Sequence, residues 1–136
     1  MACPYFFPTE KSNTILWPFP QRLPLGAGFC GTCTAGAARS VPDDAELKDF
    51  CNLGYAQCAK IPAERPSDAL RFAVAKDGGD RILLHYSSER NHAPVEHGQL
   101  QYDCATRTWP VPHPDICIQR QAECYVVTYL ERRPRS

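Results

Sequence analysis

Five of the eight cysteines lie within the first 58 residues, in a part of the chain that is rich in proline and glycine. Proline fixes the backbone angle φ and lacks an amide proton, so the prolines at positions 4, 8, 18, 20 and 24 exclude a long helix and most central strands. Aromatic and aliphatic side chains are frequent here, and they favour attachment to a core over disorder. We therefore expect residues 1–65 to form an irregular cysteine-rich half that encloses a metal centre.

The segment from Cys51 to Cys58 indicates such a centre most clearly. The two cysteines flank six residues, among which Asn52 and Gly54 both tolerate left-handed backbone. Residues 40–50 predict a short helix, because a Ser-Val-Pro-Asp sequence suits a helix start. This helix would place Cys51 at its C-terminus, where the loop of ligands begins.

Three more cysteines precede this loop. Cys30 and Cys33 have C-x2-C spacing around a glycine, and Cys3 is followed by Pro4. Cluster ferredoxins also use a remote ligand cysteine that is followed by proline. A four-thiolate centre would therefore use Cys3, one of Cys30 and Cys33, Cys51 and Cys58.

The spacing suits an iron–sulphur cluster better than zinc. Cluster thiolates converge from loops around a bulky inorganic core, whereas structural zinc is typically held by two tight C-x2–4-C knuckles. Only Cys30 and Cys33 form such a knuckle, since six residues separate Cys51 from Cys58. We expect a 4Fe-4S cluster. A structural zinc ion is the alternative, and buried core thiols without a metal are a third interpretation.

The first 62 residues also resemble small uncharacterised bacterial cysteine-rich proteins. The pattern is Cys-Pro-x-Phe, then Gly-x-Cys, then Cys-Asn-x-Gly-Tyr-Ala-x-x-Cys, and the matching residues are Cys3, Pro4, Phe6, Gly31, Cys33, Cys51, Asn52, Gly54, Tyr55, Ala56 and Cys58. The resemblance implies iron–sulphur or zinc binding and no activity. It favours Cys33 over Cys30, so the predicted ligands are Cys3, Cys33, Cys51 and Cys58, with Cys30 as the alternative to Cys33 or Cys3.

Residues 66–136 predict regular structure. Three runs, which begin at Leu70, Ile82 and Leu100, alternate apolar with other residues. Such alternation is typical of half-buried strands, so three strands are predicted. An Asp-Gly-Gly-Asp turn separates the first two strands. A helix from about Ile116 to Arg133 would follow, with Asp115 as its cap. Its apolar face would consist of Ile118, Ala122, Tyr125, Val126, Tyr129 and Leu130, and Arg132 would continue this face one turn on.

One α+β domain over residues 1–136 is therefore the predicted fold. Its N-terminal half (1–65) is irregular, rich in cysteine and proline, and contains the short helix. Its second half (66–136) is a small antiparallel sheet with the C-terminal helix packed on it.

Three cysteines fall outside the predicted centre. Cys104 continues the alternation of the third strand and is expected to be a core thiol. Cys117 and Cys124 are seven residues apart on one side of the last helix. They are interpreted either as part of a packing stripe or as a redox or second metal-binding pair.

His92 and His97 are expected in a polar loop, where a solvated turn is a simpler interpretation than a metal or proton-transfer site.

The composition limits the function classes. Net charge is zero, which argues against a nucleic-acid partner, and no apolar stretch is long enough to span a membrane. No signal-peptide pattern opens the chain, so we expect a cytoplasmic protein whose cysteines are ligands or core thiols; four disulfides are the alternative for a secreted chain. No motif indicates a catalytic nucleophile or a phosphate-binding loop, so an enzyme is not the leading interpretation. The sequence predicts a small soluble iron–sulphur protein in electron transfer or redox sensing with a redox protein partner; a structural zinc-binding interaction module is the alternative.

Overall fold

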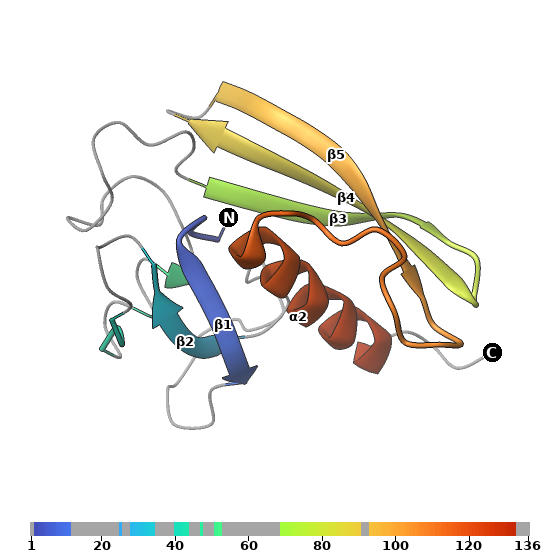
Figure 1. Ribbon diagram of the computed structural model, residues 1–136, viewed down its shortest axis with the longest axis horizontal. Coiled ribbons are helices and arrows are strands. Elements are labelled where there is room, and N and C mark those ends of the chain that lie inside the picture. The colour runs from blue at the N-terminus through green and yellow to red at the C-terminus, as the bar shows by residue number, and fades with distance from the viewer. Residues whose placement is uncertain are drawn as a thin grey trace.

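The computed structural model describes residues 2–11, 25, 28–34, 40–43, 47, 51–52, 69–90 and 93–132. Within these ranges the chain forms a two-stranded and a three-stranded antiparallel sheet and one C-terminal helix, which confirms the predicted α+β class. The helix α2 runs beside the two-stranded ribbon, and the three-stranded sheet lies on its other side (Figure 1).

The three-stranded sheet is the meander that the alternating apolar residues predicted. Its strands β3 (Ala69–Asp77), β4 (Arg81–Arg90) and β5 (Ala93–Asp103) pair in sequence order. Side chains alternate between faces along a strand, and one face carries the buried residues Leu70, Phe72, Ile82, Leu84, Tyr86 and Leu100. In the turn between β3 and β4, Gly79 has a φ of 85°, a conformation that glycine adopts without strain.

A glycine allows one large aromatic ring to lie across this sheet. Tyr86 on β4 is paired with Gly98 on β5. A Cβ atom at Gly98 would lie 2.7 Å from the hydroxyl oxygen of Tyr86, so only glycine leaves room for the ring in this position. Burial and the neighbouring Glu96 carboxylate raise the pKa of Tyr86, which keeps its hydroxyl protonated.

The N-terminal half, which was predicted as irregular apart from a short helix, contains a regular two-stranded ribbon. Strand β1 (Phe6–Lys11) pairs with β2 (Phe29–Cys33). Pro8 is tolerated because it lies in a two-stranded ribbon beside a register shift between Pro8 and Glu10. The ribbon is close-packed at Gly31, where a Cβ atom would meet the Phe7 carbonyl oxygen and lie 2.7 Å from the Cα atom of Pro8.

The helix α2 (Ile116–Arg132) begins where the sequence predicted, and the predicted last residue, Arg133, lies outside the described residues. Asp115 caps it as expected, because its carboxylate accepts the amides of Cys117 at 2.9 Å and Ile118 at 3.3 Å. The predicted apolar face is buried or packed against the core at all six positions: Ile118, Ala122, Tyr125, Val126, Tyr129 and Leu130.

One hydrophobic cluster joins both halves of the chain. It includes Ala2, Phe6 and Phe29 from the N-terminal half and the inner face of the meander and α2 from the second half. The predicted short helix at 40–50 lies mostly outside the described residues. Of its described positions, Ser40 forms a bridge with Cys33, and the Leu47 amide donates to the Asp43 carbonyl oxygen at 2.9 Å.

Two smaller expectations need correction. Cys104 lies one residue beyond the end of β5, where its amide bonds to the Asp80 carbonyl oxygen at 2.8 Å, so it is not part of the third strand. His97 lies in β5 and not in a loop, because the strand extends back to Ala93. In the described part of the chain, no helix is long and apolar enough to cross a membrane.

Candidate functional site

A tight turn near the N-terminus brings Cys3 next to Cys51. The Phe6 amide donates to the Cys3 carbonyl oxygen at 3.1 Å and closes the turn, and the Cys3 amide donates to the Cys51 carbonyl oxygen at 3.1 Å. The preceding residue, Ala2, exchanges two backbone hydrogen bonds with Leu70 on β3, at 2.8 and 2.7 Å. These bonds fix the turn between the sheet and the segment that carries Cys51, and both cysteines are buried.

Cys33 reaches the same turn from β2. It lies opposite Phe6 in the ribbon register, and it exchanges two backbone hydrogen bonds with Ser40, at 2.8 and 3.1 Å. The next amide, that of Thr34, donates to the Tyr5 carbonyl oxygen at 2.9 Å. Cys33 is also buried. The backbone segments of Cys3, Cys33 and Cys51 are therefore joined to one another by hydrogen bonds at one turn.

The predicted fourth ligand, Cys58, lies outside the described residues. Among those that are described, no three side chains of His, Cys, Asp or Glu lie close enough together to hold a metal ion. A single zinc ion requires sulphur ligands about 2.3 Å from one point.

Cys30 and Cys33 point to opposite sides of β2. They are three positions apart, and successive side chains of a strand alternate between faces. The Cys30 thiol turns towards Glu10, with Sγ at 3.5 Å from the Glu10 carbonyl oxygen and 3.8 Å from its carboxylate. Burial, and then the Glu10 charge, raise the pKa of Cys30 and disfavour the thiolate that a metal needs. The C-x2-C pair is thus no knuckle in this fold.

Sequence reasoning missed Cys117 as a neighbour of this region. Its Sγ lies 3.5 Å from Oγ1 of Thr34, the residue after Cys33, and that hydroxyl donates to the Tyr5 carbonyl oxygen at 2.8 Å. Cys124 belongs instead to the main apolar cluster, which does not include Cys117. The two helix cysteines therefore have different surroundings, although seven residues place them on one side of α2.

The contact of Cys117 with the turn region could have been predicted from Gln121. This glutamine is fully buried, and its Nε2 donates to the carbonyl oxygens of Cys3 at 2.7 Å and Phe6 at 2.8 Å. A glutamine within the apolar face of a helix must find polar partners, and a backbone turn offers them. Its position one helical turn after Cys117 places that cysteine on the side of α2 that meets the turn.

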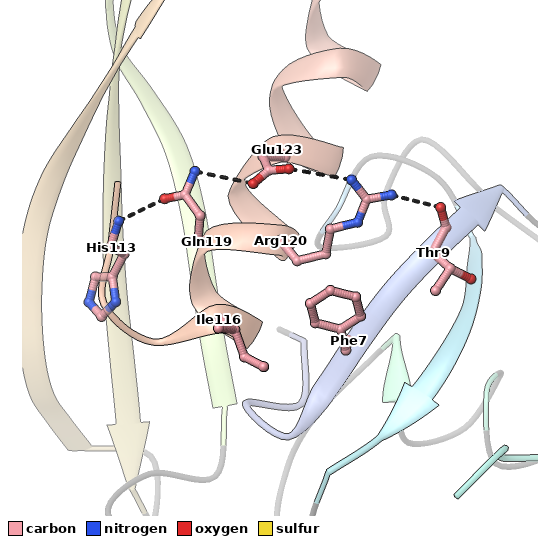
Figure 2. A pocket seen from close by; sticks show the side chains of 7 residues that line it. All are labelled: Phe7, Thr9, His113, Ile116, Gln119, Arg120 and Glu123. Atoms are coloured by element: carbon pink, nitrogen blue, oxygen red, sulfur yellow. Dashed lines mark hydrogen bonds and ion pairs between the residues drawn. The ribbon is translucent and has the colours of Figure 1, made fainter. Parts of the chain in front are cut away.

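A second feature is a groove of about 460 Å³ between β1 and the first half of α2 (Figure 2). Two residues of β1, four residues of α2 and one residue of the loop before α2 line the groove: Phe7, Thr9, His113, Ile116, Gln119, Arg120 and Glu123. No residue of the predicted metal centre contributes to it. No local sequence motif indicated this site, because its lining is contributed by segments about 100 residues apart.

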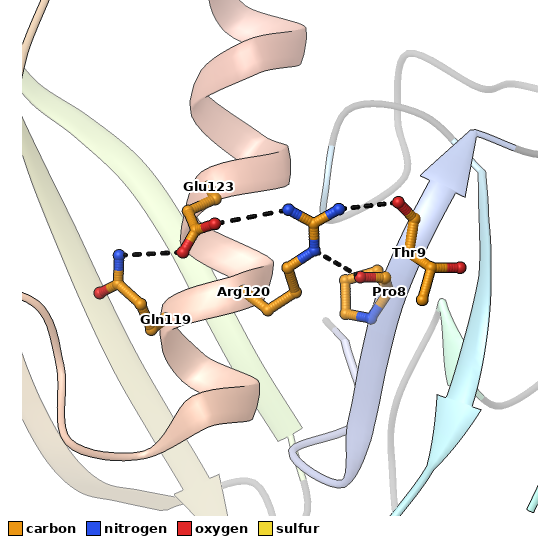
Figure 3. A network of polar contacts seen from close by, with 5 residues as sticks. All are labelled: Pro8, Thr9, Gln119, Arg120 and Glu123. Atoms are coloured by element: carbon orange, nitrogen blue, oxygen red, sulfur yellow. Dashed lines mark hydrogen bonds and ion pairs between the residues drawn. The ribbon is translucent and has the colours of Figure 1, made fainter. Parts of the chain in front are cut away.

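A chain of polar contacts joins α2 to the edge of β1 (Figure 3). The Arg120 guanidinium donates through Nε to the Pro8 carbonyl oxygen and through Nη2 to the Thr9 carbonyl oxygen, both at 2.7 Å. It also pairs with Glu123 at 3.4 Å, and Glu123 accepts from Gln119 at 3.3 Å. This chain satisfies carbonyl groups on the side of β1 that faces α2.

Of the described histidines, His113 lines the groove, whereas His85 and His97 line neither feature. His92 lies outside the described residues. His97 and His85 stack loosely on the outer face of the meander, with ring centroids 5.9 Å apart. Glu96 points to the opposite face from His97, because the two are neighbours on one strand. His97 and Glu96 therefore do not lie together in a polar loop.

Comparison of the chain with protein families, with curated proteins and with solved structures found no match. The resemblance to small bacterial cysteine-rich proteins stays a prediction, as does the choice of ligands.

Proposed function

We propose that the chain is a small iron–sulphur protein that transfers electrons or senses redox state through a 4Fe-4S cluster. Its ligands would be the thiolates of Cys3, Cys33, Cys51 and Cys58. The observation that supports this most directly is the meeting of the backbone segments of the first three cysteines at one hydrogen-bonded turn.

The surroundings of this turn suit a redox centre. Cys3, Cys33 and Cys51 are 6%, 8% and 7% exposed, so a cluster on them would be shielded from water. Pro4 and Tyr5, which follow Cys3, are partly exposed. A centre here would be close to the surface, as electron exchange with a partner protein requires. Backbone amides and burial near cluster sulphurs tune the reduction potential of such centres.

A structural zinc site is the second candidate. A two-stranded ribbon alone is marginally stable in water, and β1 and β2 have six and five residues. A metal that links this ribbon to the segment at Cys51 would contribute its binding free energy to folding. Zinc and the cluster would use the same thiols, so metal identity separates the two functions.

The pair Cys33→Ser and Cys30→Ser tests the ligand assignment with one substitution on each face of β2. Anaerobically prepared wild-type protein should show the broad charge-transfer absorption of thiolate-bound iron. Cys33→Ser should diminish or shift that absorption, whereas Cys30→Ser should leave it nearly unchanged, because its thiol points to Glu10. Loss of the absorption in Cys30→Ser with retention in Cys33→Ser would contradict the assignment.

A further inference from the structure

The groove between β1 and α2 has the size and the lining of a small-molecule site. Its volume of about 460 Å³ lies within the range of about 300–1,000 Å³ that is usual for such sites. The Phe7 ring and the Ile116 side chain form its apolar part, below the polar side chains in Figure 2. Ile116 is 54% exposed, so the groove presents apolar surface that no described residue covers.

The polar wall of the groove is held in place before any ligand arrives. The His113 amide donates to Gln119 at 2.8 Å, Gln119 donates to Glu123 at 3.3 Å, and Glu123 meets Arg120 at 3.4 Å. Arg120 is in turn fixed by the two carbonyl oxygens of β1. Such a network loses little conformational entropy when a ligand binds.

This wall retains hydrogen-bonding capacity of both kinds, side by side. The Arg120 guanidinium has five N–H groups, and three are directed to Pro8, Thr9 and Glu123. Each oxygen of Glu123 accepts one contact, at 3.3 or 3.4 Å, and a carboxylate can accept about four. A donor and an acceptor with spare capacity therefore lie next to each other above an aromatic ring.

His113 adds a further donor at the other end. Its Nδ1 accepts the Asp115 amide at 2.9 Å, so the neutral imidazole carries its proton on Nε2. The ring is also fixed by an edge-to-face contact with Tyr86, with centroids 5.0 Å apart.

We propose that this groove binds a small, planar, uncharged heterocycle that presents a hydrogen-bond acceptor next to a donor, such as an aminopyrimidine edge. The acceptor would face Arg120, the donor would face Glu123, and the ring would rest against Phe7 and Ile116. The charges of Arg120 and Glu123 offset one another, so the groove favours a neutral polar ring over a simple anion. This site is independent of the cysteine centre.

Two probes that differ by one amino group test the proposal. Isotope-labelled full-length protein is titrated with 2-aminopyrimidine, separately with pyrimidine, and with acetate as a simple anion, while backbone amide NMR signals are recorded. Signals of α2 from Ile116 to Glu123 and of Phe7 and Thr9 should shift. 2-Aminopyrimidine should bind about tenfold more tightly than pyrimidine, which corresponds to one well-formed donor–acceptor pair. Equal affinities, shifts that lie elsewhere, or tighter binding of acetate than of either ring would overturn the proposal.

Substitutions at the groove distinguish hydrogen bonding from packing. Glu123→Met keeps the length of the side chain and removes both acceptor oxygens, so the affinity for 2-aminopyrimidine should fall about tenfold to that of pyrimidine. Ile116→Ala should weaken both probes equally, because it removes only apolar contact. Arg132→Gln, an exposed change near the other end of α2, is the matched control and should change neither. Unaltered discrimination in a folded Glu123→Met protein would contradict the assigned role of its carboxylate.

Discussion

The Cys124 thiol lies in the main apolar cluster at 5% exposure, and burial raises its pKa to about 11 from an ordinary value of 9.0. Arg120 lowers the pKa by a smaller amount. The folded chain therefore holds this proton more tightly than the unfolded chain does. The resulting stabilisation is fully present below pH 9 and is lost as the pH rises towards 11, because the unfolded state then gains by ionising the thiol.

Cys124→Ala should therefore flatten the loss of stability at alkaline pH. Between pH 8 and pH 10.5 the wild-type free energy of unfolding should fall by about 2 kcal/mol more than that of the variant. The pKa values of Tyr86, Tyr125 and Cys30 are also raised, but these groups titrate in both proteins and cancel in the difference. Urea unfolding of both proteins at the two pH values measures this difference in the free energy of unfolding. Parallel falls in both proteins would show that Cys124 ionises as easily folded as unfolded.

Individual residues differ in how far the sequence could predict their roles. The cap at Asp115 was predictable, since a helix N-terminus is satisfied by the residue beside it. The environments of Cys30 and Cys33 were not, because they depend on whether the segment is a loop or a strand. In a loop a C-x2-C pair can close on one metal; in β2 it places the thiols on opposite faces.

At the scale of elements, β1 is stabilised by α2 as well as by β2. Arg120 and Gln121 together donate to carbonyl oxygens at Cys3, Phe6, Pro8 and Thr9. An unpaired strand edge would otherwise present these groups to solvent or to another chain. Farther along, Lys11 at the end of β1 forms an ion pair with Glu131. The C-terminal helix therefore positions the ribbon that carries Cys33.

Gly31→Ala and Gly98→Ala form a matched pair that tests the packing of the two sheets. A methyl group at Gly31 would meet backbone atoms of Phe7 and Pro8, which cannot move without separating the strands. At Gly98 it would meet the ring of Tyr86, which can move. We expect a loss of about 3 kcal/mol or more for Gly31→Ala and about 1–2 kcal/mol for Gly98→Ala.

Urea unfolding of both variants measures these losses, and amide NMR locates the disturbance. Gly31→Ala should shift signals in both ribbon strands and at Cys3. A smaller loss for Gly31→Ala than for Gly98→Ala would contradict the close approach of β1 and β2.

The elements fall into two groups: those that local sequence patterns predict, and those that depend on contacts between residues far apart in the sequence. The meander and α2 were predictable because alternation, an Asp-Gly-Gly-Asp turn and a helical apolar face are local patterns. The ribbon was not, because Phe6 pairs with Cys33 across 27 positions and a register shift accommodates Pro8. Proline in a short sequence window argues against a strand because it lacks an amide proton, whereas Pro8 lies in a two-stranded ribbon beside a register shift.

At the scale of the whole molecule, one apolar cluster connects the N-terminal segments to the meander and α2. The turn at Cys3 is part of this connection through Ala2 and Leu70, and Gln121 joins it to α2. A metal centre at Cys3, Cys33 and Cys51 would therefore stabilise the junction of both halves, and its binding free energy would add to the free energy of unfolding of the entire chain.

Metal content of the wild-type chain tests the proposed iron–sulphur function most directly. Protein is prepared anaerobically, and iron, acid-labile sulphide and zinc are measured per chain together with the absorption spectrum. The account predicts about four irons and four sulphides per chain, from the composition of a 4Fe-4S cluster, with broad visible absorption. A colourless protein with one zinc ion per chain would contradict the iron–sulphur function and support the structural zinc site; a colourless protein with neither metal would contradict both.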